Sequence, residues 1–241
     1  MAFLAPHSPR QPVFRAPLVV LLLIGLLVGL HVARTLLPAD QSMDMVNRFA
    51  FIPARLSPDF LSQHGINLFQ LGPPFLTYMA LHGSYTHLVV NCLWLLAFGP
   101  IVARRFGAVL FLLFFTTCGV LAVLTYLALN WGSPDPVIGA SGAISGLMAA
   151  GIRLLPTERP SWATEDGPPS EAPMLPLLSR QMLLFTLVWA ALNIVAGFTG
   201  LGMAGEVGLI AWQAHLGGYA AGLFLSGPFD RLRPQPVGQQ I

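Results

Sequence analysis

Long apolar runs separated by short polar or proline-rich stretches dominate the chain. An α-helix that crosses a bilayer needs roughly 20 consecutive, mostly apolar residues. Six runs approach or reach that length, namely 17–37, 86–100, 108–129, 137–155, 181–198 and 207–225. The pattern predicts an all-α membrane protein, folded as a bundle of six transmembrane helices in one domain over 17–226. Residues 1–16 and 227–241 are then tails.

The segment between the first two runs, 38–85, mixes charged residues with aromatic and aliphatic ones. It is too apolar to be disordered. We expect short helices at the membrane surface, at 46–56 and 67–81, because prolines should break a longer helix. These prolines are Pro53, Pro58, Pro73 and Pro74.

Composition supports a membrane protein and argues against other classes. Hydrophobic residues make up 55% of the chain and charged residues only 9%, against about 25% charged in ordinary soluble domains. A net charge of +2 without any lysine argues against nucleic acid as a partner. Cys92 and Cys118 lie inside apolar runs, so we interpret them as packing residues and predict neither a disulfide nor a metal site. The first run could also be a signal peptide, but its length favours a retained span.

The arginines are distributed unequally between the two sides of a six-span topology. Nine of the twelve fall on the side that carries both termini: Arg10, Arg15, Arg104, Arg105, Arg153, Arg159, Arg180, Arg231 and Arg233. By the positive-inside rule, this side is cytoplasmic. Since the N-terminus does not resemble a transit peptide, we expect an integral multi-pass protein of a bacterial cytoplasmic membrane.

Polar residues that are costly in a membrane lie near the beginnings of the second, fourth and sixth spans. They are His87 with Asn91, Ser141, and His215. In the predicted topology these three spans all enter the membrane from the outer face, so the four residues lie at similar depth. Ionisable groups inside membranes usually face the interior of a bundle or an aqueous cavity. We therefore expect the four side chains to converge.

Small residues should allow the fourth and sixth spans to approach closely. Gly218 and Gly222 share a helix face with His215, and Gly142 lies beside Ser141 with Gly146 one turn later. Such stripes are common in membrane helices simply because they promote packing. Here they would also bring His215 to Ser141.

Serine and histidine together form a plausible catalytic pair. A hydroxyl becomes a good nucleophile when a neighbouring base takes its proton, and neutral imidazole suits that task. His87 and Asn91, with the backbone N–H of Ser141, could stabilise the oxyanion of an acyl-transfer reaction. For each histidine, interhelical hydrogen bonding is the alternative. Asp135 and Glu206 are poorly placed to orient His215, so we expect a Ser–His dyad whose imidazole is held by packing.

Three motifs in this order and spacing resemble those of the rhomboid family of intramembrane serine proteases. They are His82-Gly-Ser-Tyr-Thr-His87-Leu-Val-Val-Asn91, Gly139-Ala-Ser141-Gly142 and Ala214-His215-Leu-Gly-Gly218-Tyr-Ala-Ala-Gly222. The resemblance implies that Ser141 is the nucleophile, His215 its base, and His87 and Asn91 the oxyanion residues, with Gly142, Gly218 and Gly222 in helix packing. It also implies proteolysis of transmembrane proteins without a cofactor, metal or ATP.

The resemblance further implies roles for the later part of the chain. The segment 197–208, with Met203, is expected to cap the site, and Phe185 and Trp189 lie either at substrate entry or in the core. Many family members carry a tyrosine four residues after the nucleophile, stacked on the histidine, whereas this chain has Ser145. Trp212 or Tyr219 could orient His215 instead.

Two other classes of function remain open. A catalytically inactive relative could bind client helices as a scaffold or chaperone, although both members of the dyad are present. A small transporter would be expected to show inverted repeats and interrupted helices, which the sequence does not suggest.

Overall fold

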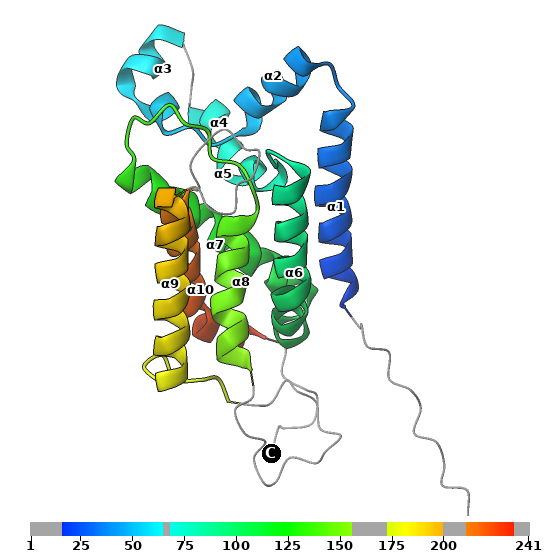
Figure 1. Cartoon of the computed structure of the whole chain (residues 1–241), viewed down its shortest axis with the longest axis vertical. Coiled ribbons are helices and arrows are strands. Elements are labelled where there is room, and N and C mark those ends of the chain that lie inside the picture. The colour runs from blue at the N-terminus through cyan, green and yellow to red at the C-terminus, as the bar shows by residue number, and fades with distance from the viewer. Residues whose placement is uncertain (1–15, 65–67, 156–172, 200–210, 234–241) are drawn as a thin grey trace, which may run out of the picture.

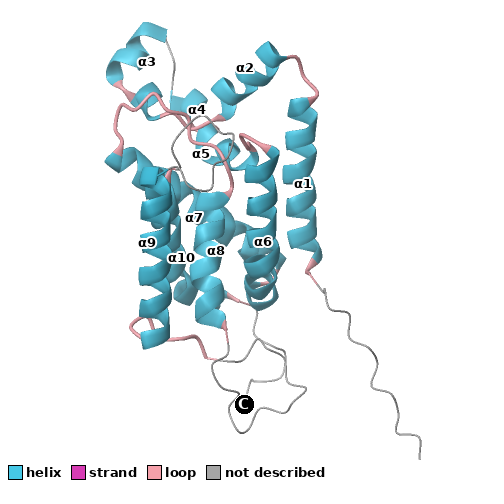
Figure 2. Cartoon of the chain, in the orientation of Figure 1, coloured by secondary structure: helices cyan, strands magenta, loops and turns pink. Residues whose placement is uncertain are grey.

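Six long helices form the bundle in the computed structural model, which describes residues 16–64, 68–155, 173–199 and 211–233 (Figure 1). Their bounds are α1 Leu18–Thr35, α6 Tyr85–Phe106, α7 Ala108–Leu129, α8 Ser141–Leu154, α9 Arg180–Thr199 and α10 Trp212–Leu232. Figure 2 shows that the described residues consist of helices and connecting loops. The prediction of an all-α protein is therefore confirmed for these residues.

Four of the long helices have the length and composition of membrane spans: α1, α6, α7 and α9. The chain is thus an integral membrane protein, while the six-span count stays a prediction. Helix α8 has only 14 residues, and from Gly142 to Leu154 all of them are buried. Neighbouring helices therefore cover α8 along almost its whole length.

The long segment between α1 and α6 folds across one end of the bundle (Figure 1). It contains α2 Ala39–Phe49, η1 Pro53–Leu56, α3 Pro58–His64, α4 Leu68–Leu71, α5 Pro74–Thr77 and η2 Tyr78–Ala80. Short helices occur in both regions where they were expected, 46–56 and 67–81, and prolines separate them, since η1 begins at Pro53 and α5 at Pro74. Between α2 and η1 the backbone is extended, and Phe51 exchanges two backbone hydrogen bonds with Val137, at 3.1 and 2.8 Å. This bridge ties the segment to the approach to α8.

Helix ends differ from the sequence prediction in three places. Helix α6 continues to Phe106, so Arg104 and Arg105 lie in its last turn and not in a loop. Helix α8 begins at Ser141 and not at Val137, whose backbone is engaged in the bridge. Helix α10 continues to Leu232, beyond the predicted span end at 225, and Asp230 in its last turn pairs with Arg105 at 2.6 Å. Residues 207–210 of the predicted sixth span lie outside the described residues.

Helix α8 packs against α10 with their backbones almost in contact. A Cβ added at Gly218 would overlap the carbonyl of Gly142, and one at Gly222 would overlap the carbonyl of Gly146. Glycine is needed at both α10 positions because any side chain would push the helices apart. The predicted close approach of these two helices is confirmed.

Arg153 ties together three parts of the chain at the other end of α8. This side chain is 8% exposed. Its guanidinium donates to Ser226 Oγ at 2.7 Å and to the carbonyls of Leu223 and Leu175 at 2.9 and 3.2 Å. A buried cation is tolerated when its donors are satisfied in this way. The contact fixes the segment before α9 against α8 and α10.

Candidate active site

Ser141 is the first residue of α8 and follows an extended segment that ends in a glycine turn. Gly139 has φ +113°, a conformation that L side chains rarely adopt. Its N–H donates to the carbonyl of Tyr78 at 2.9 Å. A Cβ at Gly139 would lie 2.6 Å from His87 Nε2 and 3.7 Å from Ser141 Oγ. Glycine therefore allows His87 to approach the serine.

The side chains of Ser141 and His215 meet between α8 and α10. Ser141 Oγ lies 2.7 Å from His215 Nε2, within hydrogen-bonding distance. The glycine contacts between α8 and α10 lie on the same helix faces as Ser141 and His215, so they set the distance between these two side chains. A nucleophile with a base at this distance has the geometry required for acyl transfer.

The other nitrogen of His215 has a partner that sequence reasoning missed. His215 Nδ1 lies 2.8 Å from Oδ1 of Asn193 on α9. The predicted packing partners lie elsewhere, because Trp212 packs against Gly197 and Tyr219 stacks on Trp189 with ring centroids 4.3 Å apart. The available signal was an asparagine inside an otherwise apolar run, which is costly in a membrane and usually has a partner.

The structure brings His87 to the serine but engages Asn91 within its own helix. Asn91 is 3% exposed, and its amide Nδ2 donates to the carbonyl of His87 at 2.9 Å. The backbone N–H of His87 is capped by Ser84 Oγ at 3.1 Å. One further N–H of the Asn91 amide is available for another acceptor. The oxyanion role of both residues stays a prediction.

Ser145 does not act on the imidazole in place of a tyrosine. Its Oγ donates to the carbonyl of Ser141 at 2.8 Å, one turn back along α8. It is a buried hydroxyl satisfied within its own helix. Orientation of His215 must therefore come from another residue.

A group of imidazoles, of which His31 and His82 are buried, extends away from the serine into the wall formed by α1 and the start of α6. The ring centroids of His87 and His82 are 5.1 Å apart, and those of His82 and His31 are 6.3 Å apart. Arg34 donates to the carbonyl of His82 at 2.7 Å. Burial lowers the pKa of His82 to about 3, and the neighbouring His87, His31 and Arg34 act in the same direction, against a smaller opposing effect of the Ala80 backbone. We expect His82 to be neutral at physiological pH.

Several residues considered from sequence lie away from this centre. Asp135 is exposed in the loop before α8 and accepts a hydrogen bond from Ser133 Oγ at 3.1 Å. Trp189 is 9% exposed and belongs to the core. Of the expected cap, 197–208, the first three residues belong to α9, while 200–208, with Met203 and Glu206, lie outside the described residues.

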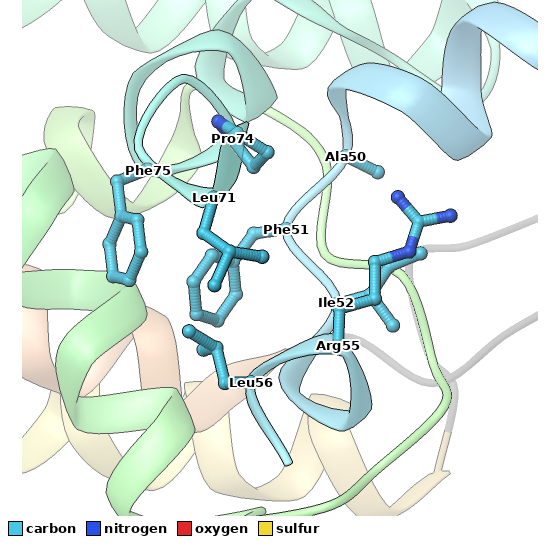
Figure 3. Close-up of a pocket in the computed structure, with 8 residues that line it drawn as sticks. All are labelled: Ala50, Phe51, Ile52, Arg55, Leu56, Leu71, Pro74 and Phe75. Carbon is cyan, nitrogen blue, oxygen red and sulfur yellow. The ribbon is translucent and has the colours of Figure 1, made fainter. Parts of the chain in front are cut away.

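A small apolar pocket lies in the long segment between α1 and α6, which we call the first loop, and is separate from the Ser–His pair (Figure 3). Its lining comprises Ala50, Phe51, Ile52, Arg55, Leu56, Leu71, Pro74 and Phe75. Arg55 is the one charged residue among them, and its guanidinium donates to the carbonyl of Asn47. The pocket carries no nucleophile or general base.

Comparison with known families gives one match. A family model described as Rhomboid domain matches residues 73–229, well over half of the chain. The matched region contains the serine, the histidine and the two predicted oxyanion residues. No curated protein matches the chain.

Proposed function

The chain belongs to the rhomboid family, and we propose that it is an intramembrane serine endopeptidase. The observation that supports catalysis most strongly is the 2.7 Å contact between Ser141 Oγ and His215 Nε2. Family membership alone is compatible with an inactive relative. A hydroxyl placed against an imidazole at the end of a buried helix is the arrangement that an inactive scaffold would not need.

The proposed reaction follows from these two side chains. His215 Nε2 accepts the proton of Ser141 Oγ as the oxygen attacks the carbonyl carbon of the scissile peptide bond. The carbonyl oxygen becomes an oxyanion, which the backbone N–H of Ser141, His87 and the Asn91 amide stabilise. His215 then gives its proton to the leaving amine. In the second half of the reaction, His215 takes a proton from water as the water attacks the acyl-enzyme, and returns the proton to Ser141 Oγ as the acid is released.

The substrates we propose are proteins with a transmembrane segment. Ser141 and His215 lie at the ends of α8 and α10 near the long first loop, which the arginine distribution places outside. Cleavage would then occur in or near the outer leaflet. Both termini would be cytoplasmic, in a bacterial cytoplasmic membrane.

Cleavage by the purified protein tests this function. Wild type reconstituted in liposomes should cleave a co-reconstituted single-span test protein, and Ser141→Ala and His215→Ala should not. Ser145→Ala is the matched control, since it removes a buried hydroxyl one turn away that donates to a backbone carbonyl and not to His215. Cleavage that survives either dyad substitution would refute the mechanism. Binding without cleavage by wild type would favour a client-binding scaffold.

A further inference from the structure

We propose that Asn193 of α9 is a positioning residue that holds His215 in the tautomer required for catalysis. The inference rests on the proposed function, because it assigns to His215 the role of general base. It begins from the 2.8 Å contact between Asn193 Oδ1 and His215 Nδ1.

The orientation of the Asn193 amide is fixed by a second hydrogen bond. Its Nδ2 donates to the carbonyl of Trp189 at 2.9 Å. A backbone carbonyl can only accept, so the NH₂ end of the amide must face Trp189. The oxygen end must then face His215.

The tautomer of His215 follows from that orientation. Since Asn193 Oδ1 can only accept, Nδ1 of His215 carries the hydrogen. In a neutral imidazole, Nε2 then has the free lone pair, and Nε2 is the atom that lies 2.7 Å from Ser141 Oγ. The opposite tautomer would direct an N–H towards the serine, which could not then lose its proton to that atom.

Contacts along α9 hold Asn193 at the height of His215. Trp189 stacks on the Tyr219 ring on one side of Asn193, and Gly197 packs against Trp212 on the other. With Asn193, these α9 residues recur every four positions and so form one helix face. They meet Tyr219, His215 and Trp212 in reverse order, as antiparallel helices require.

An uncharged group is well suited to this position. An aspartate would place a formal charge in a membrane span, which is energetically costly. The amide gives His215 an acceptor without that charge. Asn193 therefore supplies orientation, while the proton transfer itself involves only Ser141 and His215.

Kinetics of three variants test the proposal. Asn193→Ala should lower kcat about 10- to 100-fold, because the imidazole loses its fixed tautomer, with KM changed by about twofold or less. Asn193→Asp keeps an acceptor oxygen at the same reach and should recover part of the loss. Thr186→Val is the matched control, because it removes another hydrogen bond between α9 and α10 but does not touch His215. Equal kcat for Asn193→Ala and Thr186→Val would overturn the inference.

Nitrogen NMR of histidine-labelled protein tests the same bond without any turnover. The signal of His215 among the six histidines is identified by its loss in His215→Gln. Wild type and Thr186→Val should show the tautomer protonated at Nδ1, whereas Asn193→Ala should show a mixture. Wild type protonated at Nε2, or an unchanged spectrum in Asn193→Ala, would contradict the proposal. An inactive wild type with the expected spectrum would refute the proteolytic function but not the positioning contact.

Discussion

Helix α10 meets two of its neighbours, α8 and α9, in opposite ways. Towards α8, its glycines bring backbone against backbone, with no space for a Cβ at Gly218 or Gly222. Towards α9, long side chains fill the gap, through the stacked rings of Trp189 and Tyr219 and two polar contacts. The first contact fixes the distance between serine and histidine. The second determines how the imidazole ring is turned.

Helix α9 is also less buried than other helices of the bundle. Only 17% of the α9 span is buried, against 39% for the spans of α6 and α7. A helix held mainly by a few side chains can shift at lower cost than one whose backbone interlocks with its neighbour. The comparison predicts that substitutions in the glycine contact between α8 and α10 mainly lower stability, and that loss of the Asn193 contact with His215 alters the reaction more than the fold.

The largest effect is expected on the tightly packed side. Gly218→Ala places a methyl group against the Gly142 carbonyl, and backbone cannot rotate away as a side chain can. We expect a loss of about 3 kcal/mol or more in stability, at the upper end for overpacked sites, together with loss of activity. Thermal unfolding in detergent measures it.

A glycine in an open position provides the control for Gly218→Ala. A Cβ at Gly29 of α1 would meet no atom within 4 Å, so Gly29→Ala should be neutral or stabilise by about 0.5–1 kcal/mol through helix propensity. If both variants melt together, the close approach of α8 and α10 does not limit stability.

The next effect concerns catalysis on the same side. Asn91 lies on α6, which packs against α8, and Asn91→Ala should lower the cleavage rate by about 10- to 1,000-fold if the amide binds the oxyanion. The thermal midpoint should change far less than in Gly218→Ala, because the lost hydrogen bond is to the residue's own helix. An unchanged rate would remove this residue from the oxyanion site.

The pH dependence of stability should reflect the protonation of the buried His82 side chain, which lies just before α6. His82 has a folded pKa of about 3, against about 6.5 when unfolded. Below pH 6.5 the unfolded state binds the proton first, so stability falls as pH drops from about 6.5 towards 3, by up to about 1.4 kcal/mol per unit. Above pH 6.5, His82 should make no contribution to the pH dependence of stability. His82→Gln should reduce that slope, and identical slopes in both proteins would exclude His82 as its source.

The smallest effect is expected in the contact between α9 and α10. Tyr219→Phe removes the hydrogen bond to Thr186 but keeps the ring that stacks on Trp189. We expect a loss of about 0.5–1.5 kcal/mol, typical of one hydrogen bond, and nearly normal cleavage. A large loss of cleavage activity would contradict this expectation, because it would mean that the reaction requires the hydrogen bond between Thr186 and Tyr219.

Local sequence pattern was sufficient for some features. The apolar runs located the long helices, and glycine spacing predicted that the helices carrying Ser141 and His215 would approach closely. These predictions succeeded because each depends on one helix face or on one small residue. The extended backbone before Ser141 was missed, because it depends on Phe51 pairing with Val137 from a distant segment.

Asn193 could not be assigned from sequence for a related reason. A single polar residue in an apolar helix indicates that a partner exists but does not identify it. The direction that Asn193 faces depends on how α9 is rotated, and that rotation is set by Trp189 stacking on Tyr219 and by Gly197 packing against Trp212. The rotation of α9 depends on side chains of both α9 and α10, so the sequence of either helix alone does not determine it.

The most direct test of the central claim is labelling of purified protein with a fluorophosphonate probe, which needs no knowledge of the substrate. Wild type should be labelled at Ser141, mapped by mass spectrometry, and Ser141→Ala and His215→Ala should not be labelled. Labelling of Ser141 that persists in His215→Ala, or no labelling of folded wild type with this and a second serine-reactive probe, would contradict an activated Ser–His pair.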